Sequence, residues 1–542
     1  MSEKFYKDHV VYQIYPRSFC DSNSDGIGDL QGIISKLDYL KDLGVDILWL
    51  SPIYPSPNFD YGYDISDYMD INPEYGTMKD FDQLIEQANK REMKIVMDLV
   101  VNHTSSEHRW FKESQNKGSP YHDYYIYKKG KKNNKKPPNN WTSNFMGEAW
   151  TYVDKCDEWY LHLFAPEQVD LNWKNEAVYQ EVKKILEFWY SKGVYGFRCD
   201  VINQIYKTSL EDGKGNSLNR LKGGEHYISQ EGCHKILNRF HNEVFSKQKD
   251  TMVVGETVSI TIDQAKRFTS GDEIDMVFSF EHEDAPTYKL LPLVFKRFNP
   301  ERFKQIMIKW QKNIDWNANY FENHDQLRSI DHYGSRKYHK ESGKALGMLL
   351  LTLRGTPFIF QGEEIGQLDY DEYDEKNVKD IVPINIKKII SKIPLPKKMK
   401  NNFLFHYDRD NARAPFQWDK SIYAGFSSVE PWNKVTETSA HINYELQKND
   451  PDSIFNFYRD LLAYRKKNKA LSIGSIEFDP KAPKGVFAYY RTLNKDKFKV
   501  IINLNKKEVK YINLDIGEEI LKSRSDMKVG YLLPYEAVLI KL

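Results

Sequence analysis

Short apolar runs alternate with longer amphipathic stretches along most of the chain. The short runs are rich in β-branched and aromatic residues and have no polar face, as parallel strands buried on both sides do. They predict eight strands, at residues 10–15, 47–50, 95–100, 196–201, 253–256, 274–279, 320–322 and 358–361. Between most of them apolar residues recur at helical spacing, at 33–43, 81–91, 176–191, 234–245, 301–312 and 345–353. Eight βα units predict an α/β fold, the (β/α)8 TIM barrel.

Three stretches interrupt this rhythm. Residues 104–172 follow the third predicted strand without a helix, and a segment of that length predicts a small inserted domain. A second insertion, at about 370–419, follows the eighth strand. After a predicted helix at 453–467, short strand-like pieces at 485–490, 499–502 and 536–540 predict a C-terminal antiparallel β-sandwich. We therefore expect a catalytic barrel formed by 1–103 and 173–469, an inserted domain at 104–172, and a C-terminal domain at 470–542.

Charge and composition narrow the class of protein. The 78 basic and 77 acidic residues nearly cancel, so no net field favours nucleic acid or an anionic membrane as a partner. The lysine runs at 128–136 and 397–400 lie among Asn, Pro and Gly and are interpreted as solvated loops. Four cysteines do not make a disulfide framework in 542 residues. The sequence shows neither the apolar segment of a signal peptide nor an apolar run of membrane-spanning length. A cytoplasmic enzyme is expected.

Polar residues stand at the ends of four predicted strands, with carboxylates at Asp98, Asp200, Glu256 and Glu322. One such residue alone is more often a loop cap, but the C-terminal ends of barrel strands meet at one mouth, where active sites lie. Packed carboxylates raise one another's pKa, and an arginine such as Arg198 lowers it, so neighbours can differ in protonation. Retaining cleavage of an acetal needs such a pair: one carboxylate attacks the anomeric carbon while a second, which holds a proton, protonates the leaving oxygen.

Other hydrolytic chemistries lack their motifs. No Gly-x-Ser-x-Gly follows a predicted strand, as a serine hydrolase of the nucleophile-elbow type would need. Neither His-Glu-x-x-His nor paired Cys-x-x-Cys is present for zinc. The residues therefore favour carboxylate chemistry, which needs no cofactor.

Four motifs stand in order along the chain: DLVVNH at 98–103, GFRCD at 196–200, VGE at 254–256 and ENHD at 322–325. Together they resemble the motifs of glycoside hydrolase family 13, the α-amylase superfamily. The resemblance implies that Asp200 is the nucleophile, Glu256 the acid/base and Asp325 the stabiliser of the transition state. It also implies that three residues bind the glucosyl unit in subsite −1: His103, Arg198 and His324.

Further motifs resemble the oligo-1,6-glucosidase subfamily: FDYGYD at 59–64, FAPEQVDLN at 164–172, QGEEIG at 361–366 and RDNARAPFQW at 409–418. They imply that six more residues surround the same glucose: Asp60, Tyr63, Phe164, Gln168, Arg409 and Arg413. The chain departs from the subfamily at Val169, where Pro is usual, and at Ala414 and Phe416, where Thr and Met are common. Residues 376–406 are also unlike the corresponding segment of the subfamily, so the resemblance does not predict the shape of the outer, plus-side subsites.

Val201 comes directly after the predicted nucleophile. In relatives Val at this place accompanies α-1,6 specificity, and its β-branched group can narrow the approach of the +1 sugar; alternatively, Val is simply a good strand residue. The resemblance thus favours a retaining, exo-acting α-glucosidase that hydrolyses isomaltose, isomalto-oligosaccharides and panose through a covalent intermediate on Asp200. Four other activities of the family remain as alternatives: trehalose-6-phosphate hydrolase, sucrose isomerase, transglucosidase and α-1,4-glucosidase. Non-enzymatic transporter heavy chains share the fold, but they carry a membrane span and lack the full triad.

A loop after the first strand places oxygen-bearing side chains at alternate positions around Gly26. It resembles a calcium loop without the distal Glu of an EF-hand, although a polar turn before a helix explains the same residues. In relatives this loop binds a structural Ca²⁺, and the resemblance implies five ligands: Asp21, Asn23, Asp25, the carbonyl of Ile27, and Asp29.

Overall fold

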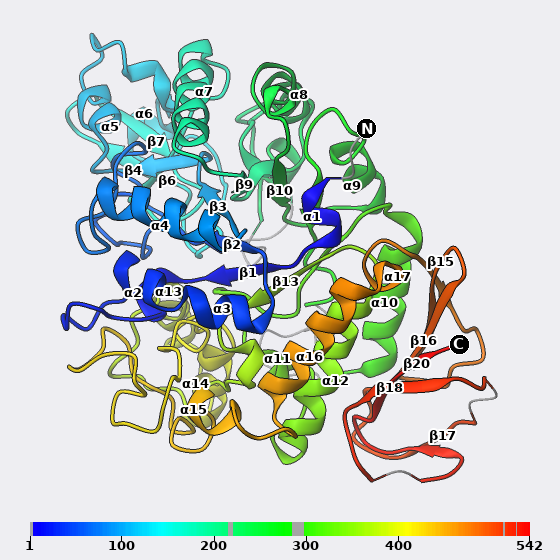
Figure 1. The fold of residues 1–542 in the computed structure, drawn as a ribbon. Coiled ribbons are helices and arrows are strands. Elements are labelled where there is room, and N and C mark those ends of the chain that lie inside the picture. The colour runs from blue at the N-terminus through cyan, green and yellow to red at the C-terminus, as the bar shows by residue number, and fades with distance from the viewer. Residues whose placement is uncertain (1–3, 215–220, 284–297, 513–514, 527) are drawn as a thin grey trace.

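The computed structural model describes residues 4–214, 221–283, 298–512, 515–526 and 528–542 (Figure 1). Its centre is a parallel sheet with the strand order β11-β10-β9-β3-β2-β1-β13-β12. The bounds are β1 (Val11–Ile14), β2 (Ile47–Leu50), β3 (Lys94–Leu99), β9 (Gly196–Cys199), β10 (Met252–Glu256), β11 (Met276–Phe278), β12 (Ala318–Asn319) and β13 (Thr356–Phe360). The two end strands, β11 and β12, lie against each other, so the sheet closes on itself. The predicted (β/α)8 barrel is confirmed.

Alternate residues of each strand face opposite sides of the barrel wall. One set fills the interior, with Val11, Trp49, Val96, Val254 and Phe278 in a single buried cluster. The other set packs outward against the helices as part of the main core. Nearly every strand residue is therefore buried, which explains why the strands read as continuous apolar runs.

Helices surround the barrel (Figure 1). They are α2 (Leu30–Ser35), α3 (Leu37–Leu43), α4 (Met78–Lys90), α7 (Glu176–Ser191), α8 (Glu231–Glu243), α9 (Ile262–Phe268), α10 (Pro300–Asn313), α12 (His339–Thr352) and α16 (Ile454–Lys467). Polar side chains cap several of their first turns, including a capping box between Thr77 and Asp80 at α4 and a single cap from Asn175 at α7. None of the helices in the described part of the chain has the length and apolar character needed to cross a bilayer.

Four local expectations differ from the structure. The predicted helix at 33–43 is two helices, because Lys36 leaves helical geometry between α2 and α3. The seventh strand, β12, begins two residues and ends three residues earlier than predicted, and its last residue, Asn319, pairs with Pro357. The short helix α9 is absent from the predicted elements. The lysines at 397–400 lie in α14 (Lys397–His406) rather than in a loop.

The two insertions contact each other. In the first, β4 (His103–Ser105) pairs with β8 (Gln168–Asp170), and a second sheet has the order β5 (Tyr127–Lys128), β7 (Glu158–Leu161), β6 (Trp150–Val153). The other insertion forms α13 (Ile381–Ile390) and α14. Phe145 of the first insertion lies in one apolar cluster with Val382, Ile386 and Phe403 of the other.

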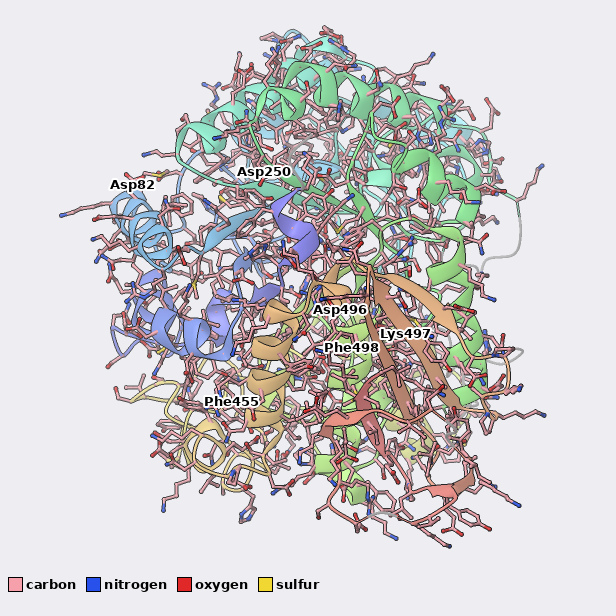
Figure 2. All side chains as sticks on the ribbon, turned by 45° about the vertical axis from the view of Figure 1, so that its right-hand side comes forward. Asp82, Asp250, Phe455, Asp496, Lys497 and Phe498 are labelled. Atoms are coloured by element: carbon pink, nitrogen blue, oxygen red, sulfur yellow. The ribbon has the colours of Figure 1, made fainter. Side chains whose placement is uncertain are left out.

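The C-terminal part is antiparallel, as predicted. One sheet has the order β14 (Ser475–Phe478), β15 (Val486–Leu493), β16 (Asp496–Asn503), β20 (Ala537–Lys541), β18 (Glu518–Lys522), and β17 (Val509–Lys510) pairs with β19 (Tyr531–Leu532). Phe498 on one face of this sheet belongs to the main core, and its ring lies 6.0 Å from that of Tyr464 on α16, the helix that carries Phe455 (Figure 2). Ile501 on the other face packs with Leu532. The domain boundaries themselves stay a prediction.

Candidate active site

The guanidinium of Arg198 joins three carboxylates at the C-terminal ends of neighbouring strands. Its Nη1 donates to Oδ1 of Asp98 and to Oδ1 of Asp200, each at 2.7 Å, and its Nη2 donates to Oε2 of Glu256 at 2.6 Å. The barrel order brings them together, because β3, β9 and β10 are adjacent and Asp98 pairs in register with Arg198. All four side chains are buried. One cation thus faces three acids with little water present.

The protonation of two of these acids differs. Burial, together with the charges of Asp200 and Asp325, raises the pKa of Glu256 to about 8 against the opposing effect of Arg198. Burial also raises the pKa of Asp200, but Arg198 limits that rise and the value is about 6. At neutral pH Glu256 therefore keeps its proton while Asp200 is ionised. This is the division of roles between a proton donor and a nucleophile.

Val201 adopts an unusual backbone conformation directly after Asp200. Its φ of 34° and ψ of 39° are left-handed, which is strained for a β-branched residue. In this conformation its N–H donates to Oε2 of Glu256 at 3.1 Å, and its side chain lines a cavity in front of the carboxylates. The strained conformation thus places both the N–H that contacts Glu256 and a side chain of the cavity wall.

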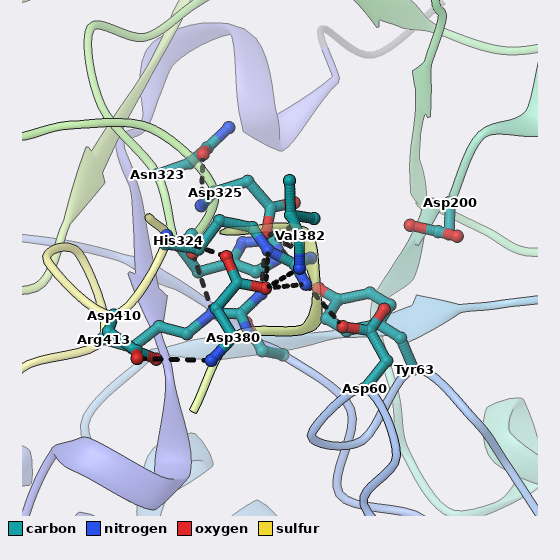
Figure 3. Close-up of polar contacts among 12 residues, drawn as sticks. Asp60, Tyr63, Asp200, Asn323, His324, Asp325, Asp380, Val382, Asp410 and Arg413 are labelled. Carbon is teal, nitrogen blue, oxygen red and sulfur yellow. Dashed lines mark hydrogen bonds and ion pairs between the residues drawn. The ribbon is translucent and has the colours of Figure 1, made fainter. Parts of the chain in front are cut away.

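Asp325 lies across the site from Asp200 (Figure 3). Its Oδ1 accepts from Arg413 at 2.8 Å and from Arg409 at 3.3 Å. Burial alone would raise the pKa of Asp325, but His324 and these two arginines hold it well below the usual range. Asp325 is therefore a permanent negative charge facing the site.

His324 is held as a neutral hydrogen-bond donor. Burial lowers its pKa to about 3. Nε2 of Gln13 lies 2.8 Å from its Nδ1, and since the Gln13 amide can only donate there, we place the imidazole proton on Nε2. Within the described part of the chain this buried Nε2 has no hydrogen-bond partner. The ring stacks on that of Tyr63 at 5.1 Å.

The other predicted pocket residues join the same network. Nη2 of Arg409 donates to Oδ1 of Asp60 at 2.7 Å, and Nε2 of Gln168 donates to Oδ2 of Asp60 at 3.1 Å. Gln168 also lies 3.2 Å from Nε2 of His103, whose ring is 5.3 Å from that of Phe164. The structure thus brings all the predicted catalytic and glucose-binding residues into one connected site, and their roles stay a prediction.

Sequence reasoning gave no role to two residues of the network. Asp98 begins the DLVVNH motif, but nothing in the sequence indicates that it shares Arg198 with Asp200. Asp380, fully buried, accepts from Nε of Arg409 at 3.0 Å and from its Nη2 at 2.6 Å, and it caps α13 through the N–H of Val382. No motif marks Asp380, because it lies in the segment unlike the subfamily.

A cavity of about 630 Å³ opens in front of this network. Glu256, Asp325 and Arg409 line it together with apolar side chains, among them Phe164 and Val382. The volume and the mixed lining are those of a pocket for a small ligand.

The predicted calcium loop is closed by its own hydrogen bonds. Asp21 accepts from the N–H groups of Ser24 at 2.7 Å and Gly26 at 2.9 Å, Asp25 accepts from the N–H of Ile27 at 2.8 Å, and Asp29 caps α2. Over the described residues, no three acidic, His or Cys side chains are grouped as a metal site. The oxygen donors suit Ca²⁺ in type, but the structure does not gather them around one point.

We expect Asp380→Ala to lower the free energy of unfolding by about 3–5 kcal/mol, because it leaves the buried Arg409 without its strongest partner. Urea unfolding monitored by tryptophan fluorescence measures this. Asp371→Ala is the matched control: it removes a partner of Arg336 at an exposed site and should cost about 1 kcal/mol or less. Equal losses in the two variants would contradict the importance of burial here.

Comparisons with known proteins agree with this geometry. Residues 13–474 match the family model described as "Alpha amylase, catalytic domain". The chain is 43% identical to an oligo-1,6-glucosidase of Bacillus cereus, over 100% of both chains. It resembles the solved trehalose-6-phosphate hydrolase of Bacillus licheniformis, with 40% identity, a TM-score of 0.92 and coverage of 99% and 100%. The solved trehalulose synthase of Pseudomonas mesoacidophila MX-45 is 35% identical, with a TM-score of 0.94 and full coverage of both chains. The chain therefore belongs to the alpha-amylase family and is a glycoside hydrolase.

Proposed function

We propose that this protein is a retaining, exo-acting α-glucosidase that hydrolyses short α-1,6-linked glucosides from the non-reducing end. The observation that carries the mechanism is the pair of carboxylates, Asp200 and Glu256, held on one guanidinium with opposite protonation at neutral pH. A pair of this kind supports double displacement, in which the configuration at the anomeric carbon is retained.

In the first step, ionised Asp200 attacks the anomeric carbon and Glu256 donates its proton to the glycosidic oxygen as the bond to the leaving group breaks. A β-glucosyl ester of Asp200 results. In the second step Glu256, now a carboxylate, takes a proton from water, which attacks the same carbon and releases Asp200. The fixed negative charge of Asp325 stabilises the positive charge that develops on the sugar ring in both steps.

The glucosyl unit would sit among the residues of the connected network. His324 offers its Nε2–H, and the carboxylates and arginines around Asp60 and Arg409 offer acceptors and donors for sugar hydroxyls. The Asp60–Arg409 pair joins the loop after β2 to the second insertion. A pocket closed at this point admits a terminal glucose rather than an internal one, which supports exo action.

The linkage preference is supported by two observations. Val201 presents its branched side chain to the cavity from a fixed, strained backbone, beside the nucleophile. The Bacillus cereus relative is named an oligo-1,6-glucosidase. Trehalose-6-phosphate hydrolysis is the second candidate, since the solved Bacillus licheniformis hydrolase of that substrate is similar over the whole chain.

Four free, buried cysteines suit a reducing compartment, and we propose that the enzyme works in the cytoplasm on oligosaccharides.

We also propose that the loop at 21–29 binds a structural Ca²⁺ through Asp21, Asn23, Asp25, the Ile27 carbonyl and Asp29. Its support is the donor set, three carboxylates with an amide and a carbonyl oxygen within nine residues. Calorimetric titration of Ca²⁺ into chelator-treated protein should show one site that Asp25→Ala abolishes, and millimolar Ca²⁺ should raise the melting temperature by mass action. A titration that shows no heat of Ca²⁺ binding would refute this proposal, and the loop would then be a hydrogen-bonded turn without a metal.

The pH profile tests the two catalytic roles. We expect kcat/KM to rise with pH through about 6, as Asp200 loses its proton, and to fall through about 8, as Glu256 loses the proton it must donate. Glu256→Gln should remove the alkaline limb from the residual activity and leave the acid limb. An alkaline limb that survives this substitution would show that another group is the acid.

The linkage is tested by offering isomaltose, panose, maltose, sucrose and trehalose-6-phosphate to the purified enzyme. We expect isomaltose to give the highest kcat/KM and an α-anomer as the first glucose seen by NMR. Val201→Thr should shift the ratio toward maltose by about tenfold, the order expected of a small change in pocket shape. Val382→Thr, the same substitution elsewhere on the cavity wall, should not change the ratio. Faster maltose turnover by the natural protein would refute the α-1,6 preference.

A further inference from the structure

A second polar group lines the cavity outside the glucose-binding network. It consists of Glu283, shortly after β11, His332 at the end of α11 (Ser329–His332), and His406 at the end of α14. The rings of His332 and His406 lie 6.3 Å apart and nearly parallel. We call these three residues the outer cluster. None of them belongs to a motif that resembles the family.

Two members of the outer cluster are buried with polar atoms that lack hydrogen-bond partners. The side chains of Glu283 and His332 are 8% and 5% exposed. Oε1 of Glu283 lies 3.3 Å from Nε2 of His282, and Oε2 lies 3.9 Å from Nε2 of His332, but neither contact has hydrogen-bond geometry. Within the residues that the structure describes, Oε1 of Glu283 and Nε2 of His332 have no partner. Buried polar atoms are nearly always paired, so these two atoms on the cavity wall are available to bind a ligand.

The charges of the outer cluster indicate which kind of ligand it can bind. Burial raises the pKa of Glu283, but the imidazoles of His282 and His332 outweigh it and keep the pKa below the usual range, so the carboxylate is ionised. Burial lowers the pKa of His332, and that of His406 to about 4, so both rings are neutral at pH 7. A carboxylate beside a neutral imidazole offers an acceptor and a donor, which matches adjacent sugar hydroxyls.

Among the described residues that line the cavity, an anionic ligand would find no free cation. Arg409 alone of these described residues carries a positive charge, and Asp60, Asp325 and Asp380 already engage it. Glu281 and Glu283 add negative charge to the wall. The described part of the wall therefore repels a phosphate on the leaving group.

We propose that Glu283 and His332 bind hydroxyls of the leaving-group sugar, so that the enzyme requires an uncharged sugar on the plus side of the bond it cleaves. This rests on the proposed function, in which Asp200 and Glu256 cleave the bond to the leaving-group sugar. The same cavity is lined by Glu256, which protonates the leaving oxygen, so a sugar bound at the outer cluster extends from the point of cleavage. Glu283 and His332 are then specificity residues that act on the aglycone alone.

The test compares isomaltose with 4-nitrophenyl α-glucoside, whose leaving group carries no sugar hydroxyls. Glu283→Gln should lower kcat/KM for isomaltose at least tenfold and change that for the aryl glucoside less than twofold. His332→Phe should give the same selective loss. Glu281→Gln is the matched control, because Glu281 lines the same cavity but is already bonded to Lys309 and to Nε1 of Trp310 at 2.9 Å. It should change neither value by more than twofold.

Equal losses on both substrates, or no loss on isomaltose, would overturn the proposal, and so would a preference of the natural enzyme for trehalose-6-phosphate over isomaltose. A binding measurement separates it from the proposed function. Isothermal titration of isomaltose into Asp200→Ala protein, with and without Glu283→Gln, reads the contact without turnover, and at least tenfold weaker binding in the double variant is expected. If the natural protein cleaves no glucoside while this difference persists, the proposed function fails and the outer cluster remains a sugar-binding site; equal binding refutes the cluster's role.

Discussion

The electrostatic balance around Arg198 is the constraint on which the site depends. Three carboxylates converge there with almost no water, and buried charges are costly unless they are paired and hydrogen-bonded. A single guanidinium cannot neutralise three acids, so at least one must hold a proton. That proton rests on Glu256, because burial raises its pKa and the negative charges of Asp200 and Asp325 raise it further. The protonated state of Glu256 thus follows from its burial and from an excess of acid over base at the barrel mouth.

The insertions complete the site that the barrel begins. The strands supply Asp98, Arg198, Asp200 and Glu256, but the arginines that hold Asp325 come from the chain after β13. Arg409 in turn is fixed by a carboxylate at the start of α13, and α13 packs on the first insertion through an apolar cluster. The position of Asp325 is therefore tied to the packing of two segments that the barrel alone does not determine.

Regular barrel geometry accounts for the part of the site that the sequence could predict. Residues at the C-terminal ends of parallel strands must meet at one mouth, so Asp200, Glu256 and Asp325 could be placed together from their positions along the chain. The position of Asp380 could not be predicted, because it depends on how α13 and α14, which no motif marks, pack against the rest of the chain. The left-handed backbone of Val201 and the approach of Glu283 to His332 are likewise set by tertiary contacts of irregular segments. The bounds of the two-residue strand β12 were likewise predicted wrongly, because so short a run is defined by its pairing with β13 rather than by its own sequence.

The strained backbone at Val201 links the stability of the protein to the shape of its cavity. A β-branched residue in the left-handed region costs of order 1–3 kcal/mol, which glycine would avoid. Glycine would also empty the cavity wall beside the nucleophile. Under the role proposed for Val201, a substitution that relaxes the chain gives up substrate discrimination, and a bulkier branched group that sharpens discrimination adds strain. Stability and selectivity would then oppose each other at this residue, so a screen for heat-resistant variants alone would enrich less selective ones.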